Sequence, residues 1–135
     1  DITDEDTPLE SGLGFAVAWD KPGGFIGRDA LLRLHDEGLR RRLAVFALAD
    51  PEPLLYGNEP IWRDGVLVGK TSSGWYGHTL GRAVALGYIG TGEPGAATSE
   101  WILGGHYEVE IANRRFAATS SLRPLYDPRG DRIRA

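Results

Sequence analysis

Hydrophobic and polar positions divide the chain into a first part with one helix and a longer part built from strands. Residues 1–10 are acidic and polar, which predicts a mobile tail. Apolar side chains then alternate with period two over residues 12–19, which predicts a strand. Residues 28–39 carry Leu31, Leu34 and His35 on one helical face, and Gly38 is a typical stop, so this stretch predicts a helix.

After residue 42 the pattern becomes that of short strands joined by turns. Residues 43–49 are apolar throughout, as in a mostly buried strand. Asp64-Gly65 separates two apolar segments and predicts a two-residue hairpin turn. Residues 81–89 alternate again, and Asn113-Arg114 is a second hairpin candidate. We therefore predict a mainly β fold, a small antiparallel barrel or sandwich with one helix packed near its start.

Length and charge narrow the class of protein. The chain has 135 residues, enough for one domain, and a net charge of −4, which gives no basic surface for nucleic acid and no attraction to an anionic membrane. It contains no cysteine, which fits a reducing compartment, so we expect a cytoplasmic location. It also contains no methionine and begins at Asp1, from which we expect a fragment of a longer protein.

The residue types that carry chemistry do not form a recognisable catalytic motif. His35, His78 and His106 have no metal-ligand spacing, so we predict no metal site. Ser72 and Ser73 lie close to His78, but no nucleophile elbow surrounds them, and we predict no catalytic residue. Tyr76 and the four tryptophans leave two interpretations open: an aromatic ligand wall, or a core or domain interface. We interpret residues 71–79, TSSGWYGHT, as a loop between two strands.

Three stretches carry a family resemblance. They are TPLESGLGFAVAWDKPGGFIGRDAL (residues 7–31), YGNEPIWRDGVLVGKTSSGWYGHTLGRAVALGYI (residues 56–89) and YEVEIANRRFAATSSLRPLYDPRGDRIR (residues 107–134). In this order they resemble the glycine-cleavage T-protein (aminomethyltransferase) family. The closest likeness is to the C-terminal folate module of dimethylglycine and sarcosine dehydrogenases.

The resemblance implies a fold and a function. The fold is the T-protein C-terminal β-barrel, with residues 1–40 as a linker strand and helix from the preceding folate-binding region and residues 41–135 as the barrel domain. The function is that of a barrel in a folate-dependent, flavin-linked dehydrogenase, closing one side of the tetrahydrofolate chamber during one-carbon transfer. Two alternatives stay open: the barrel of a glycine-cleavage aminomethyltransferase, and a non-catalytic interdomain interaction module.

Site residues and partners also follow from the resemblance. Phe15 matches an aromatic position near the folate, although it could equally belong to the core of the predicted strand. Tyr76 and His78 are candidates for hydrogen bonds to the folate or to an adjoining domain. Tetrahydrofolate is the implied cofactor of the full-length parent, and FAD belongs to an upstream domain absent here. The implied partners are these upstream domains. We therefore expect the isolated chain to be inactive, to expose an apolar patch near Phe15, Trp75 and Tyr76, and to self-associate.

Overall fold

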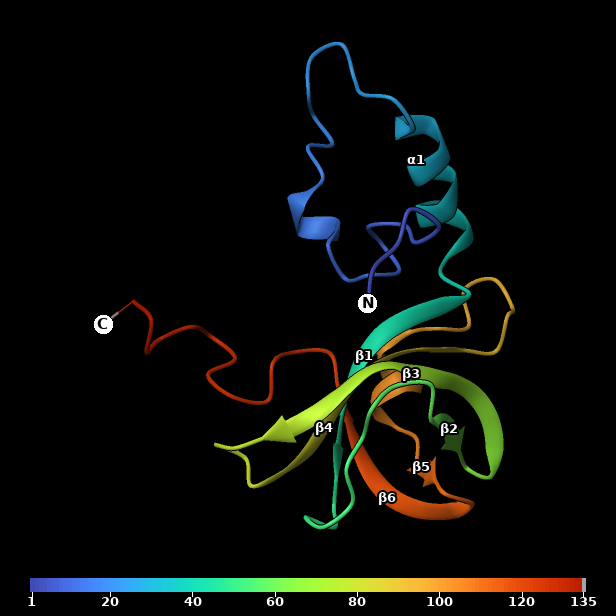
Figure 1. Ribbon diagram of the computed structural model, residues 1–135. Coiled ribbons are helices and arrows are strands. Elements are labelled where there is room, and N and C mark those ends of the chain that lie inside the picture. The colour runs from blue at the N-terminus through green and yellow to red at the C-terminus, as the bar shows by residue number, and fades with distance from the viewer. Residues whose placement is uncertain (135) are drawn as a thin grey trace.

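A computed structural model describes residues 1–134, and its main body is a closed antiparallel barrel of six strands (Figure 1). The strands are arranged around the barrel in the order β1-β4-β3-β2-β5-β6, and β6 pairs with β1 to close it. Their bounds are β1 Arg41–Leu48, β2 Pro60–Arg63, β3 Val66–Gly77, β4 Arg82–Gly90, β5 Tyr107–Ile111 and β6 Arg114–Ser121. The prediction of a small antiparallel β-barrel is thus confirmed.

Two tight hairpins set the register of the barrel. Asp64 and Gly65 both have positive φ, at 49° and 80°, and join β2 to β3 as predicted. The β5–β6 hairpin exists too, but its turn is Ala112-Asn113, with φ of 49° and 61°. The prediction placed this turn one residue too late, because asparagine tolerates the left-handed conformation at either turn position.

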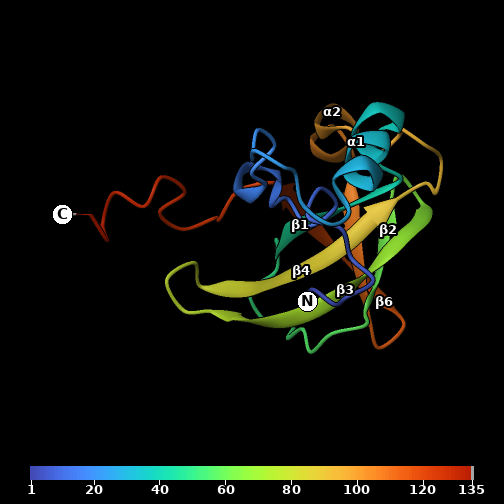
Figure 2. The same cartoon turned by 90° about the horizontal axis from the view of Figure 1, so that it is seen from above.

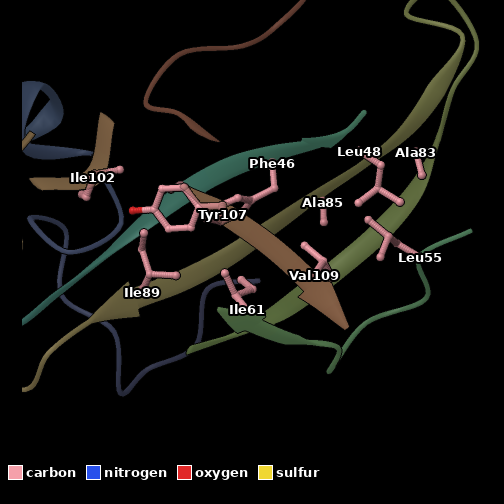
Figure 3. Packing of buried hydrophobic residues seen from close by; sticks show 11 residues of the cluster. Phe46, Leu48, Leu55, Ile61, Ala83, Ala85, Ile89, Ile102, Tyr107 and Val109 are labelled. Carbon is pink, nitrogen blue, oxygen red and sulfur yellow. The ribbon is translucent and has the colours of Figure 1, made fainter. Parts of the chain in front are cut away.

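The barrel interior is filled by side chains that alternate along each strand (Figure 3). On β4 the inward positions include Ala83, Ala85 and Ile89, which are at most 4% exposed. Large inward side chains from the other strands fill the space that these alanines leave; they are Phe46, Leu48, Ile61, Tyr107 and Val109. The larger side chains that alternate with these alanines on β4, those of Val84 and Leu86, face outward.

An arm formed by the first 40 residues stands beside the barrel (Figure 1). It contains a short 3-10 helix, η1 (Gly14–Ala16), and helix α1 (Arg28–Glu37). The α1 prediction is confirmed, but the strand predicted for residues 12–19 is wrong. Turn hydrogen bonds such as Ala16 N–H to the Leu13 carbonyl replace strand pairing there. No residue of α1 or η1 is buried, and the domain division at residue 40 stays a prediction.

Two further segments differ from the sequence interpretation. The expected loop of residues 71–79 is mostly strand, because β3 continues to Gly77 and pairs with β4. Serine and glycine have low strand propensity, which hid this pairing from the sequence. A second short helix, α2 (Ser99–Leu103), was also missed; the Thr98 hydroxyl caps it by accepting the Trp101 N–H at 3.0 Å.

Candidate functional site

Phe15 projects from the arm with most of its ring uncovered. It lies in η1 and is 87% exposed, which excludes the alternative that it fills a strand core. A pocket of about 340 Å³ lies beside it, and its other lining residues come from the arm, α1 and the start of β1: Leu9, Gly12, Gly14, Leu34, His35, Gly38, Leu39 and Arg42. An uncovered aromatic face beside a pocket is suited to stacking on a flat ligand ring.

Tyr76 and His78 lie together at the end of β3. Tyr76 is half-buried and pairs in register with Ala83, and His78 follows in the exposed turn to β4. Their rings meet edge to face, with centroids 5.3 Å apart. The structure thus brings two of the three predicted site residues together, and their hydroxyl and imidazole groups can supply hydrogen bonds to a neighbouring group.

Phe15 is not part of that pair. The pocket beside Phe15 includes neither Tyr76 nor His78, and Trp75 borders a separate hollow of about 190 Å³ on the barrel wall. The expectation of one connected apolar patch is therefore not met. For a folate, Phe15 fits the requirement of an exposed ring to stack on, while Tyr76 and His78 offer polar groups from another element.

A second hollow on the arm combines aromatic, apolar and charged side chains. Its volume is about 570 Å³, and Trp19, Arg28, Leu32 and His35 are among its lining residues. The rings of Trp19 and His35 lie edge to face, with their centroids 6.2 Å apart. The Nε of Arg28 is buried and makes no hydrogen bond within the described residues. Asp20 also lines this hollow, so it carries charges of both signs. Of the two interpretations that the sequence left open for Trp19, the aromatic ligand wall fits this position, because the ring borders a hollow and does not fill a barrel core.

Sequence reasoning also missed the role of Glu59, which organises the loop before β2. Its carboxylate accepts the Tyr56 N–H at 2.7 Å and the Gly57 N–H at 3.0 Å, and the hydroxyl of the fully buried Thr71 also donates to it. Partial burial raises the pKa of Glu59, but these hydrogen bonds outweigh it, so the net pKa is lowered. The charged form therefore holds this loop against β3.

A cluster around Arg41 fastens the arm to the barrel. The Arg41 guanidinium contacts the carboxylates of Asp6 at 2.8 Å and Glu10 at 3.1 Å and lies over the ring of Tyr88, 4.8 Å from its centroid. Ser11 adds a 2.8 Å hydrogen bond to the Tyr88 hydroxyl. The pKa of Asp6 is lowered, chiefly by the backbone N–H of Thr3 and further by Arg41. We call these residues the Arg41 clasp.

Hydrogen bonds and a neighbouring positive charge lower the pKa of Asp64. The backbone N–H of His106 is the main cause, and the His106 ring and the charge of Arg63 add to it. Arg63 is itself stacked on Trp101, 4.7 Å from the ring centroid. The His106 side chain is 97% exposed, so water screens this pair. Together with the backbone hydrogen bonds between Asp64 and His106, the group links the β2–β3 turn to the start of β5 and does not form an enclosed acid–base site.

Residues 1–134 contain neither a grouped set of metal-binding side chains nor a helix suited to cross a membrane. No three histidine, cysteine, aspartate or glutamate side chains in this range are grouped so that they could hold a metal ion. Neither α1 nor any other helix in the same range has the length and apolar character needed to cross a membrane.

The closed six-stranded antiparallel barrel is the fold of the C-terminal barrel domains of aminomethyltransferase-type proteins. The family described as the glycine cleavage T-protein C-terminal barrel domain matches residues 41–127, and the chain belongs to this family. The family resemblance found in the sequence is therefore confirmed. The crystal structure of the glycine cleavage system aminomethyltransferase T from Bartonella henselae has the same fold, with a TM-score of 0.73 at 23% identity over 90% of this chain and 33% of that one.

The chain spans only about one seventh of the length of the similar proteins that follow. A 4-methylaminobutanoate oxidase (formaldehyde-forming) of Paenarthrobacter nicotinovorans is 43% identical over 99% of the chain and 15% of its own length. Human mitochondrial sarcosine dehydrogenase is 34% identical over 99% of the chain and 14% of its own length. The mitochondrial pyruvate dehydrogenase phosphatase regulatory subunit of Mus musculus is 41% identical over 93% of the chain and 15% of its own length.

Proposed function

We propose that this chain is the C-terminal barrel of a folate-dependent, flavin-linked enzyme of the dimethylglycine/sarcosine dehydrogenase type. Within the whole protein it closes one side of a tetrahydrofolate chamber. The observation that carries the proposal is that nearly the whole chain aligns with only 14–15% of relatives named for the oxidation of N-methyl amines. The remaining length of such a protein has room for the flavin and folate-binding domains. By itself the chain is expected to turn over no substrate.

The chemistry assigned to the parent divides between its domains. When bound, FAD in an upstream domain would supply the oxidation of the N-methyl amine, and tetrahydrofolate would take up the one-carbon unit. The contribution of this chain is to bind and orient the folate. Phe15 would stack on a flat ring of the folate, and Tyr76 and His78 would hydrogen-bond to the folate or to the adjoining domain. The proposed compartment is the cytoplasm, which cell fractionation tests.

The full-length protein tests the folate assignment. Calorimetry with tetrahydrofolate should show binding, and in a sarcosine or dimethylglycine turnover assay methylene-tetrahydrofolate should form faster than it does when the same amount of free formaldehyde is mixed with tetrahydrofolate without the protein. Removing the Phe15 ring with Phe15→Ala should weaken folate binding about 2–10-fold, since an aromatic stack contributes ~0.5–1.5 kcal/mol. Tyr56→Ala removes another exposed aromatic ring, 76% exposed in the loop before β2, and should leave folate affinity unchanged.

A second function is favoured by one relative. The regulatory subunit from Mus musculus is 41% identical to the chain, so a barrel of this kind also occurs in a protein named for regulation. As such a module, the parent would bind a protein partner and show no heat of folate binding. Wild-type calorimetry therefore separates the two functions, and turnover without any effect of folate would also contradict the first.

A further inference from the structure

The outer wall of the barrel carries an apolar surface on which Trp75 is largely exposed and Val45, Val84 and Leu86 are half-buried. Val45 on β1, Val84 and Leu86 on β4, and Trp75 on β3 border a hollow of about 190 Å³, and we call these four residues the outer apolar patch. Trp75 is 71% exposed, and no lining residue of the hollow is charged. Large apolar side chains face outward here because the inward positions of β4 include alanines.

The start of the chain runs along the same wall toward this patch. The Arg41 clasp fixes Asp6 and Glu10 near Tyr88, at the end of β4. Asp1 lies further along, where the Ser72 hydroxyl donates to its carboxylate at 2.9 Å and contacts the Leu86 carbonyl at 3.2 Å. In Figure 2 this segment crosses β4 and then lies over β3, directed toward the β3–β4 turn.

The position of Asp1 and the direction of the chain at this point indicate which segment covers the outer apolar patch. Ser72 is three residues from Trp75 on β3, a distance of about 10 Å at the usual strand rise. Three or four extended residues before Asp1 therefore suffice to reach Trp75. Because the family places this barrel at the C-terminal side of longer proteins, we propose that the residues immediately preceding Asp1 in the full-length protein pack on the outer apolar patch. An uncharged, apolar segment matches its lining.

Cysteine pairs in the full-length protein test the proposal. Val84→Cys is combined in turn with a cysteine at the second, third and fourth residue before Asp1, after any native cysteines outside this cysteine-free region have been replaced. A disulfide needs Cα atoms about 4.4–6.8 Å apart, so mild oxidation should give an intramolecular bond for at least one pair. Val66→Cys, at the β2–β3 turn and 64% exposed, is the matched control and should form none.

Thiol labelling tests the proposal independently of whether any of the cysteine pairs has the geometry that a disulfide needs. Val84 is half-buried and Val66 is 64% exposed, so each cysteine is compared with itself. In the full-length protein, Val84→Cys should react at least tenfold more slowly than the same cysteine in a full-length variant whose four residues before Asp1 are replaced by a glycine–serine linker, whereas Val66→Cys should react equally fast in both. Equal labelling rates of Val84→Cys in the two proteins, or no disulfide with any upstream cysteine, overturn the proposal. A bond between two protein molecules would assign the patch to a second copy and also overturn it. These readings do not involve folate, so they succeed or fail separately from the proposed function.

Discussion

At the residue scale, loss of the Glu59 side chain should disturb the loop before β2. One carboxylate satisfies the backbone N–H groups of Tyr56 and Gly57 and the buried Thr71 hydroxyl. Glu59→Ala leaves these donors without a partner and should lower the free energy of unfolding by about 1–3 kcal/mol. Urea denaturation at pH 7 measures this. Glu52→Ala, in the same loop but exposed, should change it by less than ~0.5 kcal/mol.

The same carboxylate predicts an acid dependence of stability. Because the pKa of Glu59 is lower in the folded protein, its contribution is present above the unfolded pKa of about 4.3 and is lost as the pH falls through the folded pKa. Stability measured by urea denaturation at pH 7 and at about pH 3.5 should therefore drop less in Glu59→Gln than in the wild type, since glutamine does not titrate. Equal drops in both proteins would contradict the assignment.

Single residues also show which features of the site the sequence could not predict. It picked out Phe15, Tyr76 and His78, and the structure places the last two in contact. It recorded Glu59 only as a letter of the family pattern, because the partners of its carboxylate include Thr71, which lies twelve residues away and on another strand. A hydrogen bond of this kind has no local periodicity, so no pattern along the chain could have predicted it.

At the element scale, Gly74 lets the loop before β2 approach β3 closely. Leu55, from the loop before β2, packs directly on Gly74, and an added Cβ would lie 2.8 Å from the Leu55 carbonyl carbon. Gly74→Ala should therefore destabilise the protein by about 1–3 kcal/mol through overpacking. Gly77→Ala in the same strand meets its neighbours no closer than 3.4 Å and should be tolerated. Thermal unfolding of the two variants makes the comparison, and equal midpoints would exclude this packing.

The sequence predicted an element correctly where adjacent residues determine it, and failed where distant parts of the chain do. The Asp64-Gly65 turn depends on two adjacent residues and was predicted correctly. Residues 71–77 form strand only because β4 supplies hydrogen-bond partners, and they were interpreted as a loop. The alternation of residues 12–19 was misleading for the opposite reason. No neighbouring strand pairs with this segment, and Phe15 in its middle is exposed.

At the scale of the whole molecule, the arm and the barrel have different degrees of burial. The barrel encloses its own core, including Phe46, Ile61 and Val109, which are fully buried. The arm buries no residue of α1 or η1, although Phe15 and Ile26 are large apolar side chains that it leaves exposed. An element with an uncovered apolar surface is typical of a domain that packs on a larger body, which agrees with the length of its relatives.

The Arg41 clasp should decide whether the arm stays on the barrel. Arg41→Ala removes the contacts to Asp6 and Glu10 and the stacking on Tyr88, which are partly exposed and together contribute roughly 1–2 kcal/mol. This corresponds to a 5–30-fold increase in the open population of the arm. Hydrogen exchange should therefore accelerate by that factor at amides of residues 3–13, while amides of β1 and β4 beyond the clasp keep their protection. Arg40→Ala, whose side chain reaches only the Gly92 carbonyl, is the matched control and should leave the arm protected. Uniform acceleration through the barrel would instead show that arm and barrel unfold as one unit.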